Sequence, residues 1–159
     1  MLIPFMRGRV ITALASAPDV LDALLGSIGL ADPMWDNRPD PDRFTLREIV
    51  AHLADYEVIW PVRIAQTRDI AGPIIRMVDP GQLALDNDYA SSDPLLHRKL
   101  FRERRTAFAG VLRSLQDDDW LKVAQMGNLG PLTLEEQAAF IAVHDGYHMG
   151  QVAQWLSAF

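Results

Sequence analysis

Apolar residues recur every three or four positions in four separate stretches of the chain, the spacing of amphipathic helices. The first predicted helix covers about residues 9–28, and Pro18 marks either a break in it or a fresh helix start. Its apolar stripe consists of Val20, Leu21, Leu24, Leu25 and Ile28. A loop rich in proline and aspartate then separates this helix from the next one.

The second predicted helix begins with a capping box, in which Thr45 is the N-cap and Glu48 reaches back to it. Its inward stripe, on whose side His52 also lies, contains Ile49, Leu53, Tyr56 and Trp60. Pro61 predicts a kink, after which the helix resumes to about Arg68. Residues 69–92 form a long connection with turn signals, and such a connection lets helices two and three of a bundle run parallel.

The third predicted helix starts at Asp93-Pro94 and runs to about Leu115. The mixed charges of residues 97–105 indicate a solvated helix face, and His97 is expected to be solvated with them. The fourth helix opens with the capping box of residues 133–136 and runs nearly to Phe159. No stretch keeps the alternation of a strand, so we predict a single all-α domain over residues 1–159, a four-helix bundle.

Composition narrows the possible partners and locations. The net charge is −6, from 15 basic and 21 acidic residues, which argues against general affinity for nucleic acid. No apolar run is long enough to span a membrane. The short apolar run after Arg9 is broken by Thr12 and Ser16, so it is better explained as a helix than as a signal peptide. We therefore expect a cytoplasmic protein with neither nucleic acid nor membrane as partner.

Three of the four histidines suggest a metal site. His144 and His148 are four residues apart, which places both imidazoles on one helix face. His52 is seven residues past its N-cap, about 10 Å along its helix, and His148 is eleven residues before the chain end, about 16 Å from it. The three imidazoles therefore fall near one level if the two helices are antiparallel. A three-histidine site with an open position is typical of catalytic zinc, whereas the alternative is a set of hydrogen-bonded core histidines.

Other residues near His144 and His148 bear on what kind of metal site the histidines would form. A zinc protease needs glutamate after the first histidine, and here that position is Asp145, which leaves Asp145 either as an outer partner of the site or exposed. Cysteine is absent, so the chain has no thiolate ligand and no thiol nucleophile of its own. Four small residues form a stripe along the fourth predicted helix: Ala142, Gly146, Gly150 and Ala153. Such a stripe predicts close approach of another helix, within the bundle or across a dimer. The alternative is that its glycines are merely tolerated at the surface.

The chain resembles the DinB-like superfamily of four-helix-bundle metalloproteins from about Pro18 to Leu156. The matching segments are residues 45–55, 130–134 and 144–151, with further similarity at Trp120 and over residues 72–79. The order and spacing of these segments make the resemblance specific, although each is weak alone. The resemblance implies an up-down-down-up bundle, a divalent transition metal on His52, His144 and His148, and a homodimer.

Several activities are compatible with this resemblance. Some relatives are S-transferases or isomerases that use a thiol such as bacillithiol, mycothiol or glutathione, and others look like metal-dependent hydrolases. We expect zinc or nickel, although imidazole also suits copper and iron. The first hypothesis is a thiol transferase acting on a small electrophilic substrate, with Asp55, Tyr56 and Gln151 orienting ligands or contacting substrate and residues 79–89 capping the pocket. The alternatives are a hydrolase, in which the metal activates water, and a non-enzymatic dimer with a vestigial site.

Overall fold

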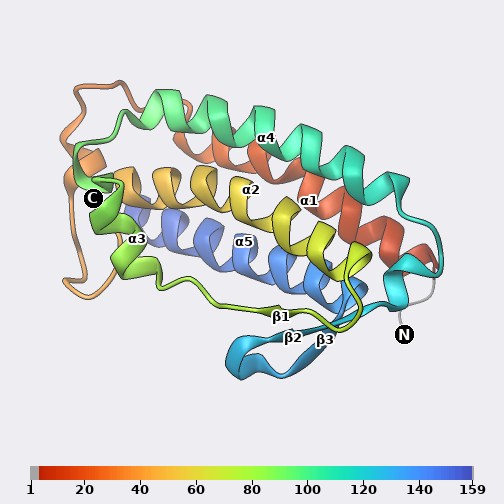
Figure 1. Cartoon of the computed structure of the whole chain (residues 1–159). Coiled ribbons are helices and arrows are strands. Elements are labelled where there is room, and N and C mark those ends of the chain that lie inside the picture. Colours follow the sequence, from red (N-terminus) through yellow and green to blue (C-terminus); the bar gives the residue numbers. More distant parts are fainter. Residues whose placement is uncertain (1–3, 159) are drawn as a thin grey trace.

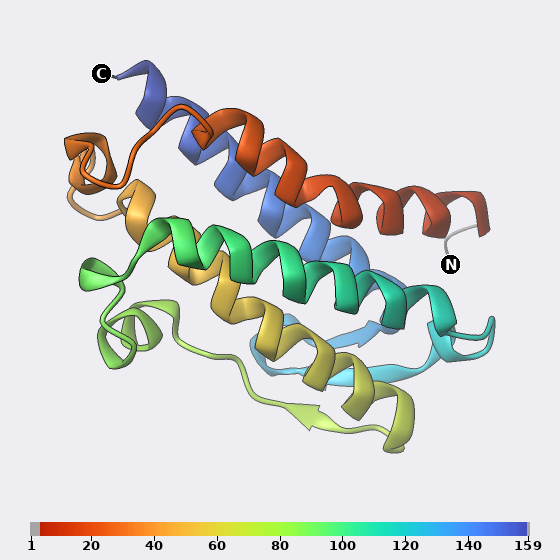
Figure 2. The same cartoon turned by 90° about the horizontal axis from the view of Figure 1, so that it is seen from above.

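The computed structural model describes residues 4–158 and contains four long helices (Figure 1). These are α1 (Pro4–Leu25), α2 (Leu46–Asp69), α4 (Pro94–Ser114) and α5 (Leu134–Ser157). Helix α1 packs on α4 and α5, and α2 packs on the same two helices. In Figure 2, α2 and α4 start at one end of the bundle and run side by side, whereas α1 and α5 start at the other end. The bundle predicted from the apolar spacing is therefore present.

Short elements fill the connections. A 3-10 turn at Pro33–Asp36 precedes α2, and the segment after α2 contains β1 (Ile74–Ile75), α3 (Pro80–Asp86) and a 3-10 turn at Tyr89–Ser91. Between α4 and α5 lie two further 3-10 turns, Asp119–Leu121 and Gly127–Leu129, and the strands β2 (Val123–Met126) and β3 (Pro131–Thr133). None of the helices in the described part of the chain combines the length and the apolar content needed to cross a bilayer.

The small sheet corrects the prediction that no strand is present. Strand β1 pairs in parallel with β2, with Ile74 opposite Gln125, and β2 pairs antiparallel with β3, with Ala124 opposite Leu132. Ile75, Ala124 and Met126 form a buried cluster of their own. Strands of two to four residues are too short to show a lasting alternation, so pairing between distant segments, rather than local pattern, defines them.

The capping boxes occur where they are predicted. The Thr45 backbone N–H donates to Glu48 at 2.8 Å while the Glu48 backbone N–H donates to Thr45 Oγ1, and Thr133 and Glu136 repeat the arrangement at the start of α5. Such caps satisfy backbone donors that a helix cannot pair internally. They set the starting points of the two helices that carry the three histidines.

Two prolines lie inside helices instead of interrupting them. Helix α1 begins at Pro4 and ends at Leu25, earlier at both ends than predicted, and it continues through Pro18 without a break. Helix α2 likewise continues through Pro61. Because Pro18 has no N–H, it leaves the carbonyl of Leu14 without its helical donor. That carbonyl accepts a hydrogen bond from Arg105 Nη1 at 3.1 Å, so α4 compensates for the proline in α1.

The prediction of a solvated face on α4 is correct for part of the charged segment only. Lys99 and Glu103 are exposed, and Arg98 pairs with Asp22 of α1 at 2.7 Å. Arg105, however, is completely buried, so its assignment to the solvated face is wrong. Its position follows the spacing of the inward stripe formed by Phe101, Phe108 and Leu112, a signal that its charge obscured.

Candidate metal centre

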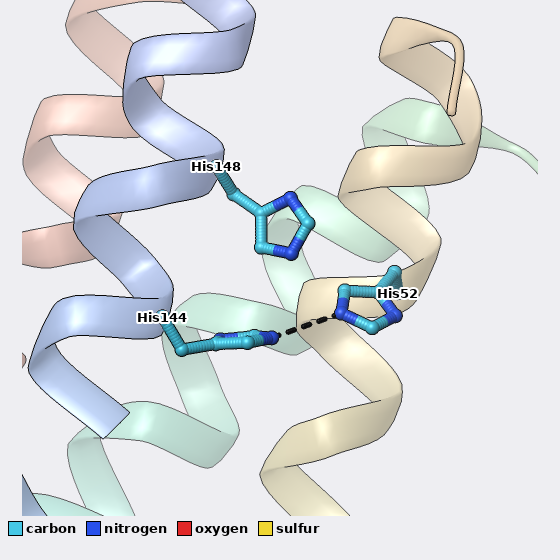
Figure 3. A group of neighbouring side chains, drawn as sticks. All are labelled: His52, His144 and His148. Carbon is cyan, nitrogen blue, oxygen red and sulfur yellow. Dashed lines mark hydrogen bonds between the residues drawn. The ribbon is translucent and has the colours of Figure 1, made fainter. Parts of the chain in front are cut away.

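Helices α2 and α5 bring the three predicted histidines together (Figure 3). His52 Nε2 lies 3.0 Å from His144 Nε2, and His148 lies one helical turn beyond His144 on the same side of α5. One ring nitrogen from each histidine lies within 4.8 Å of the others. The fourth histidine, His97, lies at the start of α4, where its Nδ1 is 2.9 Å from the carbonyl oxygen of Asp93.

The surroundings keep two of these imidazoles neutral. Burial lowers the pKa of His52 to about 2, and the neighbouring His148 and His144 add to the effect. Burial also lowers the pKa of His148 to about 4, with His144 again contributing. A neutral imidazole offers a lone pair on one ring nitrogen, which is the form that binds metal. The Nδ1 atoms of His52 and His148 are buried without a hydrogen-bond partner among the described residues, so no hydrogen bond at Nδ1 fixes either ring.

A buried ion-pair network lies beside the Nδ1 atom of His144. Asp145 Oδ1 lies 3.5 Å from His144 Nδ1, and the Asp145 carboxylate is paired with Arg105 Nη1. Arg105 Nε also donates to Glu57 Oε2 at 2.8 Å. Asp145 is 4% exposed, which supports its interpretation as an outer partner of the site rather than as an exposed residue. A carboxylate beside the second nitrogen of a ligating histidine is a recurrent way to fix the tautomer and the orientation of that ring.

The two carboxylates of this network differ in their electrostatics. Burial raises the pKa of Glu57, and hydrogen bonds from Arg105 only partly oppose that effect. For Asp145, hydrogen bonds from His144 and Arg105 outweigh burial and lower the pKa below its ordinary value. Two carboxylates around one guanidinium leave an excess of buried negative charge next to the histidines. Such a charge favours a cation in front of His144.

The histidines open into a pocket of about 410 Å³. Beyond the three histidines its walls comprise residues from four regions of the chain: Asp42, Arg43 and Phe44 before α2, Tyr56 on α2, Pro80 and Gly81 at the start of α3, and Tyr147 and Gln151 on α5. The predicted contribution of residues 79–89 is thus limited to the first turn of α3. A volume of this size accommodates a small organic molecule.

Of the three further residues predicted near the site, Tyr56 and Gln151 line the pocket and Asp55 does not. Tyr56 lines the pocket and stacks on His144 with ring centroids 5.2 Å apart. Gln151 also lines it and donates from Nε2 to the carbonyl of Phe44 at 3.1 Å, so it holds the pocket wall in place. Asp55 is not among the lining residues; it accepts a hydrogen bond from Asn87 Nδ2 at 2.7 Å and thereby ties α2 to the segment after α3.

Several features of the site were missed by sequence reasoning. Arg43 is in a loop without periodic pattern; its guanidinium lies over the ring of Trp155 at 4.6 Å and that of Tyr147 at 5.6 Å. Glu57 does follow the inward spacing of α2 and could have been found from it. At Gly146 and Gly150 the stripe of small residues on α5 does not approach another described helix, because a Cβ atom at either glycine would meet nothing within 4 Å.

Two comparisons with known proteins found similarity to this chain. The chain is similar over 98% of its length to YfiT from Bacillus subtilis, described as a probable metal-dependent hydrolase with an unusual four-helix bundle topology. The TM-score is 0.89, the sequence identity is 20%, and 88% of that chain is covered, so the likeness concerns the fold. A search of curated proteins gives no significant match. The sequence model of the DinB superfamily matches residues 13–152, and the chain therefore belongs to the DinB superfamily.

Proposed function

We propose that the chain is a metal-dependent enzyme whose divalent transition metal is held by His52, His144 and His148. The observation that carries this proposal is the approach of three histidine ring nitrogens, within 4.8 Å of one another, at a pocket large enough for a substrate. Three histidine ligands leave a coordination position free, as in catalytic zinc sites. Imidazole ligands suit zinc and nickel, the two metals that we consider first.

The proposed reaction is transfer of a low-molecular-weight thiol to a small electrophile. A metal held by the histidines would supply a Lewis acid that lowers the pKa of a thiol or a water. Much of the pocket wall is aromatic, with Phe44, Tyr56 and Tyr147 available to bind an organic molecule and exclude water. The chain has no cysteine, so the sulfur nucleophile would come from a small molecule such as glutathione, bacillithiol or mycothiol.

Hydrolysis is the second candidate, and the carboxylates around the site favour it less. A hydrolase that activates water at a metal usually also has a general base within reach of that water. Asp145 and Glu57 are both engaged by Arg105, which leaves neither free for proton transfer. Asp42 is the one acidic residue among those that line the pocket, and it is exposed. What favours hydrolysis is that a metal held by three histidines can activate water without a second cofactor.

An assay with and without thiol distinguishes these reactions. Protein loaded with zinc or nickel is incubated with an epoxide or alkyl halide and one of the three thiols, and thiol consumption is measured. We expect consumption that depends on both metal and protein and that disappears in the His148→Ala variant. Loss of the electrophile without thiol would instead favour hydrolysis. No metal-dependent turnover with any of the thiols, or of the electrophile alone, would leave a vestigial, non-enzymatic metal site.

We also propose the up-down-down-up topology and a homodimer. The topology is supported by Figure 2, in which α2 and α4 start at one end of the bundle and α1 and α5 start at the other.

The dimer is supported by Gly146 and Gly150, which leave open space on α5 next to the exposed side chain of Val143. Small residues of this kind let a second helix approach closely. Sedimentation should therefore give twice the chain mass of 17.8 kDa, and the Gly150→Trp variant should sediment as a single chain. A single-chain mass for the unmodified protein would contradict the dimer.

A further inference from the structure

Three arginines in the described part of the chain are more than nine-tenths buried, and one of them has no acidic partner. Arg105 is paired with Glu57 and Asp145, and Arg7 is paired with Glu135. Arg63 on α2 is 4% exposed, yet none of the ion pairs among the described residues includes it. Its Nη1 is buried without a hydrogen-bond partner, and its Nη2 reaches the carbonyl of Arg76 only at 3.5 Å. A buried charge without compensation is strongly unfavourable, so this arrangement requires an explanation.

A second unpaired donor lies beside Arg63. Trp60 is 3% exposed, and its Nε1 also has no hydrogen-bond partner among the described residues. The Arg63 guanidinium carbon lies 5.1 Å from the centre of a Trp60 ring. Both residues line one small cavity of about 10 Å³ between α2, the sheet and α5. Two residues with buried, unpaired donors therefore line the same small space.

The remaining lining of this cavity offers little to a hydrogen-bond donor. Apart from Trp60 and Arg63 it consists of five apolar residues and Gln137: Ile64, Met126, Leu132, Phe140 and Ile141. The amide of Gln137 is engaged, because its Nε2 donates to Thr67 Oγ1 at 3.1 Å and to the Leu132 carbonyl, while its Oε1 accepts from Thr67 Oγ1. A water molecule in the cavity would accept two hydrogen bonds but have poor partners for its own protons.

We propose that this cavity binds one monatomic anion, a halide such as chloride, held by Arg63 Nη1 and Trp60 Nε1. An anion accepts from both donors, needs no acceptor in return and neutralises the buried guanidinium. The cavity has room for about one particle of the size of a water molecule, which excludes carboxylate and phosphate groups. Burial lowers the pKa of Arg63, and an anion at this point would oppose that effect. None of the three histidines lines this cavity, although the Trp60 ring lies against that of His144 with centroids 5.5 Å apart, and the proposal does not depend on the proposed metal.

Thermal unfolding at constant ionic strength tests the proposal in solution. Sodium gluconate is replaced stepwise by sodium chloride, and the midpoint of unfolding is followed for the unmodified protein and three variants. For the unmodified protein, each tenfold rise in chloride above its Kd should lower the unfolding equilibrium constant about tenfold. The Arg63→Met variant should lose this dependence, and Trp60→Phe, which keeps a ring but lacks the N–H, should bind chloride about tenfold more weakly.

The control is Arg113→Met, because Arg113 is exposed in the last turn of α4 and should leave the chloride dependence unchanged. Equal chloride dependence in Arg63→Met and the unmodified protein would overturn the proposal, as would the absence of any dependence in the unmodified protein. In gluconate alone, Arg63→Met should be at least as stable as the unmodified protein, since the variant removes a charge that has lost its partner. A loss of stability that is the same in gluconate and in chloride would count against an anion.

Crystals of the unmodified protein grown with bromide give a test that does not depend on any variant folding. Bromide scatters X-rays anomalously, whereas water does not. We expect an anomalous peak beside Arg63 Nη1 and Trp60 Nε1. Density at this point without an anomalous signal would identify a water molecule and overturn the proposal.

Discussion

Replacing Arg105 with methionine is expected to lower the free energy of unfolding by about 3–5 kcal/mol, the range found when one partner of a buried ion pair is removed. The guanidinium is completely buried, and it pairs with Glu57 of α2 and Asp145 of α5 while donating to the Leu14 carbonyl of α1. Methionine fills a similar volume but leaves both carboxylates buried without compensation. Urea denaturation at pH 7 measures the change.

Variation of the pH provides a second check on the same variant. Without Arg105, burial should hold the pKa values of Glu57 and Asp145 above their unfolded-state values. Groups with raised pKa values favour the folded state at low pH and lose that contribution as the pH rises through the folded-state pKa. The loss of unfolding free energy in Arg105→Met, measured against the unmodified protein, should therefore become smaller as the pH falls from 7 towards the ordinary pKa range of carboxylates. A deficit that is independent of pH would indicate lost packing rather than lost charge compensation.

The matched control for this variant is Arg102→Met, one turn earlier on α4. Arg102 pairs with Asp19 and Asp22 at the surface, and exposed pairs of this kind contribute at most about 1 kcal/mol. The triple variant Glu57→Gln, Arg105→Met, Asp145→Asn should recover much of the stability that Arg105→Met loses, because it removes all three charges together. If Arg105→Met were as stable as Arg102→Met, the network would not be important for the fold.

Replacing His148 with alanine is expected to abolish stoichiometric metal binding, lowering the affinity by at least about 100-fold. Loss of an outer hydrogen-bond partner of a ligand already costs about 10–100-fold, and loss of the ligand itself should cost more. His148 is buried and its pKa is lowered to about 4, so its imidazole is neutral and able to bind metal near neutral pH. Elemental analysis of the purified protein and titration with zinc or nickel in competition with a chelator provide the measurement.

The control for the histidine variant is His97→Ala. His97 lies on α4, outside the three-histidine group, and its ring contacts the backbone of Asp93. The unmodified protein and His97→Ala should both hold one metal ion per chain, and chelation should destabilise both, because a metal that binds only the folded state stabilises it. Equal metal content in His148→Ala and His97→Ala would show that metal binds elsewhere.

The four long helices, and the starting points of α2, α4 and α5, could be predicted from local sequence. The apolar spacing of α1, α2, α4 and α5, and the capping boxes at Thr45 and Thr133, depend on residues within one or two turns of each other. The spacing of His144 and His148, together with the height of His52 along α2, was enough to predict that the three imidazoles meet. That prediction needed only the helical rise and the assumption of antiparallel neighbours.

The sheet and the buried charges could not be predicted in this way. Strands β1 and β2 are about fifty residues apart, and their pairing depends on how the connections fold over α2 and α5. Arg105 was assigned to the surface because charge outweighed its inward spacing, and Glu57 and Asp145, which make its burial possible, lie on two other helices. Burial of a charge is decided by partners that are distant in sequence.

The sequence by itself therefore determined the four helices, the two caps and the three histidines that share one level of the bundle. Only the tertiary structure decided what surrounds them, because the surroundings arise from contacts between helices. The carbonyl that Pro18 leaves free accepts from Arg105, Arg105 holds Asp145 beside His144, and Arg63 faces a small cavity without a carboxylate. Local pattern specifies each helix and its faces, whereas the electrostatics of a site depend on charges that several helices bring together.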